Sequence, residues 1–347
     1  MRVVKKTFEQ TNEHYKLISE YEIEKGFQTD VEKGLSSLFL LSQNLPLREV
    51  SDFLSGENFS MAESFEEIEV SYHLIKYGFY KQSMISLRTG LEIGLLSIYW
   101  SIIGKDNPDF KKWLSSKLDT PYKNEKFWKK IKSNISIEQF DKKFNLIEDI
   151  KSFGLSDFVH TKGIWYSNFG DFQRKLKGHD KYENFKDWVE NFKEIVRIIE
   201  VLHLLKFPTL NIRLSTEFLL SRFATFDNIP QFGAGHGDEM QVTTSFIPKE
   251  QLSFINNLAN SNDEVIEIKK WIDSLPKLTT KEIEHKILDA QKSNIKMSGF
   301  EVWYSNVKLY DNRITSNMIS SLEEWAISNN LMTIDNIMEN RDKKTSS

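Results

Sequence analysis

This 347-residue sequence has no cysteine and little proline or glycine. Without cysteine the chain has no disulfide, no thiolate metal ligand and no cysteine nucleophile. Only 7 Pro and 15 Gly are available to interrupt secondary structure. That scarcity favours long helices over an architecture of strands and turns.

A long apolar run is also missing. The most apolar stretch, residues 91–103, is too short to span a bilayer and has Arg88 and Glu92 beside or inside it. The first residues, MRVVKKTFEQ, lack the apolar segment of a secretory signal. We therefore predict a soluble, cytoplasmic protein with no membrane contact.

The composition that is present suits a globular protein with an aromatic-rich core or interface. Hydrophobic residues make up 39% of the chain, charged residues 28% and aromatic residues 13%. The formal net charge of −4 gives no overall electrostatic signature of a nucleic-acid or anionic-membrane binder. Any such partner must therefore be recognised locally.

Helical periodicity runs through most of the chain. Residues 61–79 place apolar side chains at steps of three and four, and residues 81–103 are apolar nearly all round beyond Leu91, so we expect the second helix at the centre of a bundle. Residues 300–310 suit a strand or a helix equally, and residues 240–247 suit a short strand. Further helices are predicted at 137–153, 184–205, 249–258, 263–275, 280–293 and 317–329.

The predicted fold class is mainly α. We expect a multi-helix bundle over residues 1–210 and a smaller C-terminal helical or α+β domain over 214–340, followed by a frayed tail at 341–347. The boundary is placed in the segment 206–215, which contains Pro208 and short polar residues.

Arg88 and Glu92 are the first candidate site residues. They lie four residues apart on the most apolar predicted helix, so their side chains share one face and can pair. One hypothesis is a structural ion pair that fixes the helix register. The other is a pocket in which the pair holds a ligand or positions a catalytic group.

His160 is the second candidate, in the segment LSDFVH at 155–160. A histidine near an apolar face is commonly a structural residue with its hydrogen bonds satisfied. If His160 faces Glu92, however, the carboxylate would orient the ring and raise its basicity, as acid–base catalysis requires. The sequence leaves both readings open.

A resemblance bears on these residues. The stretch HLIKYGFYKQSMISLRTGLE at 73–92 resembles the first helical hairpin of HEPN-like bacterial proteins, and LSDFVH resembles a serine-and-histidine helix of some relatives. This resemblance implies a four- or five-helix bundle from a toxin–antitoxin or phage-defence system, and in active members a metal-independent RNase. The RNase motif pairs an arginine with a histidine a few residues later. Here Arg174 is followed by Lys and His179 is preceded by Gly, so we expect an inactive or ligand-binding relative.

A basic and aromatic stretch covers residues 105–143, with 11 Lys against 6 Asp and Glu. Its candidate nucleic-acid contacts combine lysines for phosphate with indoles for base stacking: Lys112, Trp113, Lys126, Trp128, Lys129 and Lys130. The alternative is a lysine-rich surface over aromatic core anchors. The glycine-rich segment 233–237 is best explained as a turn, and we predict no metal site and no cofactor.

Two functions follow from these observations. The first is a non-catalytic binding or scaffolding protein that takes a protein partner or a second copy of itself. The second is a hydrolase acting on RNA or a nucleotide, with His160 as general acid and base, Arg88 stabilising a phosphate charge and Glu92 orienting the His160 ring.

Overall fold

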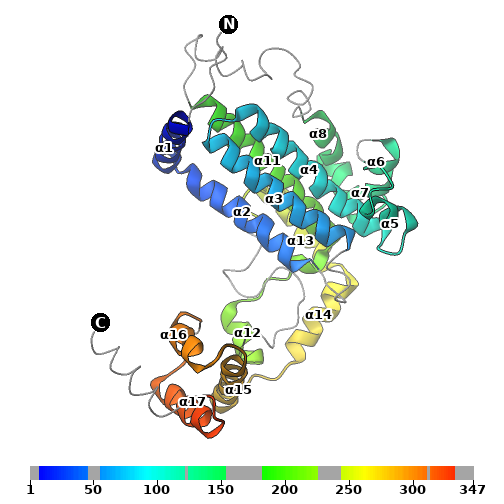
Figure 1. The fold of residues 1–347 in the computed structure, drawn as a ribbon. Coiled ribbons are helices and arrows are strands. Elements are labelled where there is room, and N and C mark those ends of the chain that lie inside the picture. The colour runs from blue at the N-terminus through cyan, green and yellow to red at the C-terminus, as the bar shows by residue number, and fades with distance from the viewer. Residues whose placement is uncertain are drawn as a thin grey trace. The chain divides into compact units, whose positions relative to one another are not determined.

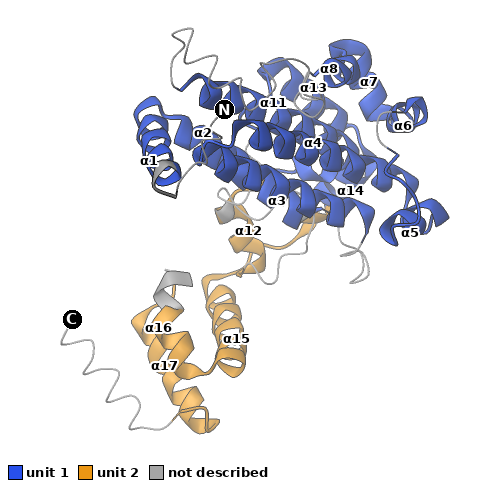
Figure 2. Cartoon of the chain, turned by 45° about the horizontal axis from the view of Figure 1, so that its top comes forward, with its two compact units in different colours: residues 1–213, 231–235, 239–270 blue, residues 214–230, 236–238, 271–347 orange. Residues whose placement is uncertain are grey.

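The computed structural model describes residues 8–45, 55–121, 124–153, 182–225, 244–310 and 313–332. Every regular element in these ranges is a helix, which confirms the mainly α fold class (Figure 1). None of the described helices is both long and apolar enough to cross a membrane. The chain divides into two compact units (Figure 2).

Unit 1 comprises residues 1–213, 231–235 and 239–270. Its helices, in chain order, are α1 (Phe8–Lys25), α2 (Phe27–Asn44), α3 (Gly56–Lys76), α4 (Tyr80–Ile103), α5 (Pro108–Leu114), α6 (Glu125–Ile131), α7 (Ile135–Phe144), α8 (Leu146–Ser152), α11 (Glu183–Lys206), the 3-10 helix η3 (Pro208–Asn211) and α13 (Lys249–Asn260). Helix α14 (Asp263–Ser274) runs from unit 1 into unit 2.

Helices α3 and α4 form an antiparallel hairpin whose seam is built from small residues. Gly90 allows the close approach, since a Cβ at this position would lie 2.4 Å from Ile68 Cγ1 and 3.1 Å from the Ser64 carbonyl oxygen. Serine hydroxyls cross the seam to main-chain carbonyls: Ser64 to Gly90 at 2.7 Å, Ser83 to Ser71 at 2.8 Å and Ser97 to Glu57 at 2.8 Å. The seam is therefore both tightly packed and hydrogen-bonded.

Helix α11 is the most buried helix of unit 1, and every residue from 195 to 205 on it is buried. It packs against α2, α4 and α3, and also against α7 and α13. Its apolar side chains join one large hydrophobic core with those of α2, α3 and α4. Figure 1 shows α11 and α13 behind α2, α3 and α4.

The segment 137–153, predicted as one helix, is two helices. Asn145 has a left-handed backbone, with φ +54°, and ends α7. Asparagine tolerates this conformation better than most residues. The Asp141 carboxylate then accepts the main-chain N–H of Ile147 at 2.7 Å, which caps the start of α8. The apolar spacing alone gave no sign of this break.

Unit 2 comprises residues 214–230, 236–238 and 271–347. Its helices are α12 (Thr216–Phe223), α15 (Thr280–Ser298), α16 (Phe300–Tyr310) and α17 (Ser316–Ser328). They have a separate hydrophobic core, which includes Ile295, Phe300, Trp303 and Leu322. The ambiguous stretch 300–310 is thus a helix. The strand expected at 240–247 lies partly outside the described residues, and at 244–247 it is wrong: Thr244 has φ +50° and Ile247 N–H donates to Thr244 O at 3.1 Å in a turn.

Candidate functional site

Arg88 and Glu92 pair as their spacing predicts. Arg88 Nε donates to Glu92 Oε1 at 2.7 Å on α4, with the two side chains 15% and 24% exposed. The guanidinium Nη1 is buried and has no hydrogen-bond partner. The pair is thus partly buried, with one donor left over on the arginine.

His160, the third residue of the predicted catalytic set, falls outside the described residues. Arg174, His179 and the glycine-rich segment 233–237 lie outside them as well. Whether His160 meets Glu92 therefore stays a prediction.

The two tryptophans of the basic stretch pack into unit 1. The Trp128 ring is 7% exposed and stands edge-on to Phe127, at 5.1 Å between ring centroids. Trp113 is partly buried, with its ring centroid 5.3 Å from that of Trp100. These contacts correspond to the aromatic-anchor alternative. Base stacking by these indoles stays a prediction.

Of the lysines of the same stretch, Lys112, Lys126 and Lys129 are exposed and Lys130 is half-buried. Lys112 bonds Asp109 at 3.3 Å, whereas Lys126, Lys129 and Lys130 on α6 form none of the ion pairs found among the described residues. Spacings of three and four place these three side chains on one face of α6.

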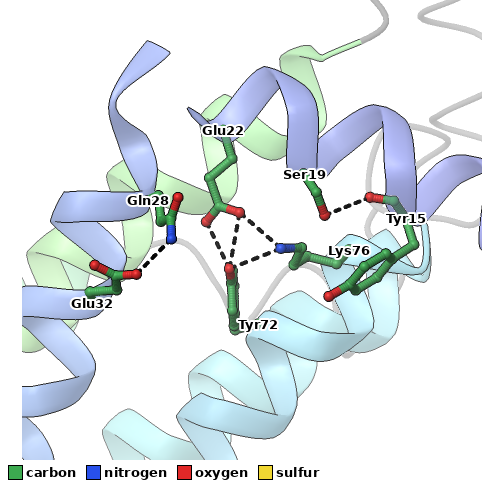
Figure 3. Close-up of polar contacts among 7 residues, drawn as sticks. All are labelled: Tyr15, Ser19, Glu22, Gln28, Glu32, Tyr72 and Lys76. Carbon is green, nitrogen blue, oxygen red and sulfur yellow. Dashed lines mark hydrogen bonds and ion pairs between the residues drawn. The ribbon is translucent and has the colours of Figure 1, made fainter. Parts of the chain in front are cut away.

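A buried ionic triad joins α1 to α3 (Figure 3). Lys76 Nζ donates to Glu22 Oε2 at 2.9 Å and to Tyr72 Oη at 3.1 Å, and Tyr72 Oη donates to Glu22 Oε1 at 2.8 Å. Glu22 is 1% exposed and Lys76 is 7% exposed. Burial, followed by the bond to Glu22, raises the pKa of the Tyr72 phenol. The three side chains therefore serve as hydrogen-bond partners for one another.

Two aromatic rings contact the lysine of this triad. The Lys76 ammonium lies 4.8 Å from the Tyr15 ring centroid and 5.0 Å from that of Tyr72, which is favourable for cation–π attraction. A nearby cavity of about 10 Å³ holds no more than a water molecule. It is lined by His14, Ile18, Ile75, Gly78, Tyr80, Asn184 and Phe185. The arrangement anchors α1 and does not form a substrate pocket.

A second buried polar centre lies on α11, where Glu200 and His203 have no exposed surface. The Ser37 hydroxyl of α2 donates to Glu200 Oε1, while Glu200 Oε2 has no hydrogen-bond partner. Burial raises the pKa of Glu200 to about 7, against smaller opposing effects of Ser37 and Arg213.

His203 faces α4. Burial lowers the pKa of its imidazole to about 4, so the ring is neutral at pH 7. The ring nitrogens lie 2.7 Å (Nδ1) from Ile199 O and 3.1 Å (Nε2) from Ser97 Oγ. Because a carbonyl only accepts, Nδ1 carries the proton and Nε2 is an acceptor. The single Ser97 hydroxyl hydrogen therefore has two acceptors within reach, Nε2 and the Glu57 carbonyl oxygen. This histidine is a structural link between two helices.

Sequence reasoning missed both buried centres. The available signal was an ionisable residue inside an apolar helix face: Lys76 one turn after Tyr72, and Glu200 and His203 within the apolar segment 195–205. Among the described residues, no group of three His, Asp or Glu side chains is arranged to hold a metal ion. Comparison of the chain with protein-family models, with curated proteins and with solved structures finds no match.

Proposed function

We propose that this chain is a non-catalytic binding or scaffolding protein, a component of a bacterial phage-defence or toxin–antitoxin system. Its helical bundle would dock a protein partner on an apolar strip along α2 and α3, formed by Leu35, Phe39 and Phe65. The HEPN-like resemblance of residues 73–92 supports a role in such a system. The apolar strip supports binding of a protein partner.

The exposure of Phe39 carries this proposal. Its side chain is 48% exposed, and its ring lies 5.6 Å from that of Phe65 between centroids. Leu35, partly buried, lies one turn earlier on the same face of α2. Apolar side chains that adjoin one another at the surface are typical of interaction sites, whereas isolated ones are common everywhere.

The buried polar groups fit a scaffold as well. The triad of Glu22, Tyr72 and Lys76 ties α1 to α3, and His203 ties α11 to α4. These contacts hold helices in fixed register.

The test is an affinity purification from native cells at low salt, followed by light scattering and mass spectrometry. Wild type should retain a stoichiometric protein, and Phe39→Ser should lose it with little change in thermal midpoint. Ile135→Ser is the matched control, because Ile135 is 71% exposed at the start of α7, away from the strip. A monomer without a stoichiometric partner would overturn the proposal. A second copy as the retained protein would make the strip a homodimer interface.

The alternative function is a HEPN-like hydrolase acting on RNA or a nucleotide. One observation favours it: Arg88 Nη1 has no acceptor, so the guanidinium keeps a donor that a phosphate oxygen would accept after local rearrangement. The lysines at 126, 129 and 130 would hold the RNA backbone. His160 would be the general acid and base.

His160→Ala tests this alternative. Loss of RNA cleavage with an unchanged thermal midpoint is the expected result, whereas a large loss of stability would make His160 structural. For binding, replacing Lys126, Lys129 and Lys130 by alanine should flatten the salt dependence of RNA affinity. The matched control replaces three exposed lysines elsewhere in unit 1: Lys33, Lys249 and Lys270.

A further inference from the structure

The seam between α2 and α11 is tightly closed. The two helices run parallel, as contacts at successive positions show: Asp30 bonds Lys193 at 2.7 Å, and Ser37 bonds Glu200. Between these, a Cβ on Gly34 would lie 2.5 Å from Phe192 Cζ. A seam this close leaves the Glu200 carboxyl without solvent.

Glu200 is satisfied on one side only. Oε1 accepts from Ser37, and Oε2 has no hydrogen-bond partner although the side chain is fully buried. A buried carboxylate with one acceptor site unused is costly, whereas the protonated acid is uncharged. The geometry therefore favours the protonated form while the seam is closed.

The charged groups around Glu200 do not replace that missing partner. On α11 itself, Arg197 Nε donates to Glu194 at 2.8 Å and its Nη1 donates to Gln251 of α13 at 3.0 Å. Arg213, two residues after the end of η3, exerts a field that lowers the pKa of Glu200, yet burial outweighs it.

Among the described residues, no charged side chain of α2, α3, α4, α7 or α13 forms a hydrogen bond or ion pair with Glu200. The α4 residue that contacts His203 is Ser97, whose hydroxyl is neutral. From α3, the described contact is Ser71 with the Trp188 indole N–H at 2.7 Å, about three turns before Glu200. On α2, Asp30 is already paired with Lys193.

We infer that the α2–α11 seam is a proton-controlled joint: it is closed when Glu200 is protonated, and ionisation of Glu200 favours its opening. Opening transfers the Glu200 proton to solvent and exposes the carboxylate to water. Because α2 carries Leu35 and Phe39, the joint would control the apolar strip. This regulatory role rests on the proposed function, whereas the joint itself does not.

The size of the effect follows from proton linkage. The pKa of Glu200 is about 7 in the closed seam, and its ordinary value is 4.5 once exposed. Between these values the closed form retains a proton that the open form has lost. The opening equilibrium of α2 should therefore rise about tenfold for each pH unit from pH 5 to pH 7, and level off above pH 7.

Hydrogen exchange of the full chain at several pH values tests this inference. Amide protection in residues 34–41, corrected for the intrinsic exchange rate, should fall about tenfold per pH unit in wild type and stay constant in Glu200→Gln. Glu194→Gln is the control and should behave as wild type, because Glu194 lies on α11 but pairs with Arg197. Equal pH dependence in Glu200→Gln and wild type, or none in wild type, would overturn the joint.

A second measurement keeps the inference testable should Glu200→Gln not fold. The NMR titration of the Glu200 carboxyl carbon in wild type should have a midpoint near 7. An ordinary midpoint near 4.5 would overturn the joint. The exchange data need no partner. Failure to find a partner would overturn the proposed function but not the joint. Amide protection that does not change with pH would overturn the joint but not the proposed function.

Discussion

Glu200 and His203 lie three residues apart on α11, both fully buried, and burial drives both toward their uncharged forms. The pKa of Glu200 rises to about 7 and that of His203 falls to about 4. Their contributions to stability therefore change with pH in opposite directions.

The signs follow from proton linkage. For Glu200 the folded pKa lies above the ordinary value of 4.5, so its contribution is fully present below pH 4.5 and is lost as the pH rises through about 7. For His203 the folded pKa lies below the ordinary value of 6.5, so its contribution is fully present above pH 6.5 and is lost as the pH falls through about 4. Between pH 4.5 and 6.5 the two groups change the free energy of unfolding with pH in opposite directions, so their effects offset each other.

Glu200→Gln should remove the Glu200 contribution to the pH dependence of the free energy of unfolding. We expect the free energy of unfolding of the variant, relative to wild type, to increase by about 1.4 kcal/mol per pH unit between pH 4.5 and 7, the linkage value for a fully buried group. Urea unfolding of both proteins at half-unit pH steps measures this difference. A constant difference across the range would show that Glu200 titrates normally. Glu194→Gln should give a nearly constant difference.

Lys76→Met should destabilise unit 1 strongly. The change leaves Glu22 as a buried carboxylate with Tyr72 alone as its donor, and breaking a buried pair from one side typically costs about 3–5 kcal/mol. The double variant Glu22→Gln with Lys76→Met should recover much of that loss, because no charge is left buried. Chemical unfolding of the four proteins gives the coupling free energy.

The surface pair Lys142–Glu138 supplies the control for that cycle. Its side chains are 71% and 45% exposed, so Lys142→Met should change stability by less than about 1 kcal/mol. If Lys76→Met costs no more than Lys142→Met, the triad is not the anchor of α1.

Much of the fold was predictable because it follows from the spacing of apolar residues along each helix. The spacing of apolar residues gives the bounds of α11 to within one residue and those of α3 to within five. The pairing of Arg88 with Glu92 needs only the geometry of one helix. The break at Asn145 depends on one left-handed residue, which the apolar pattern does not reveal.

The buried centres depend on contacts between distant residues. Glu22 and Lys76 are 54 positions apart, and Ser37 and Glu200 are 163 apart. No periodicity links such pairs, because each forms only after the helices have packed. An ionisable residue on an apolar face indicates that a partner is needed, but not which one.

Gly90→Ala should destabilise the hairpin of α3 and α4. The new methyl group would lie 2.4 Å from Ile68 Cγ1 and 3.1 Å from the Ser64 carbonyl, so the two helices must move apart, at a cost of about 1–3 kcal/mol. Thermal unfolding measures the loss, and Thr89→Ala on the partly exposed side of α4 is the control. Ile68→Ala combined with Gly90→Ala should cost less than the sum of the single changes. Strict additivity would mean that the methyl group does not meet Ile68.

Gln291→Leu should weaken the core of unit 2. The Trp303 indole N–H donates to Gln291 Oε1 at 2.7 Å, and both side chains are buried. Removing the acceptor leaves a buried donor without a partner, which costs about 1–3 kcal/mol. Adding Trp303→Phe removes that donor, so the double variant should cost less than the sum of the two single changes.

Native-state hydrogen exchange distinguishes this local loss from a general one. Protection should fall in α15, α16 and α17, whose side chains form the separate core of unit 2, and should stay unchanged in α3 and α4. Lys281→Ala, in the first turn of α15 and exposed, should leave both sets of amides as in wild type. Equal loss of protection in α3 and α4 would show that the two cores unfold as a single cooperative unit, contrary to the prediction.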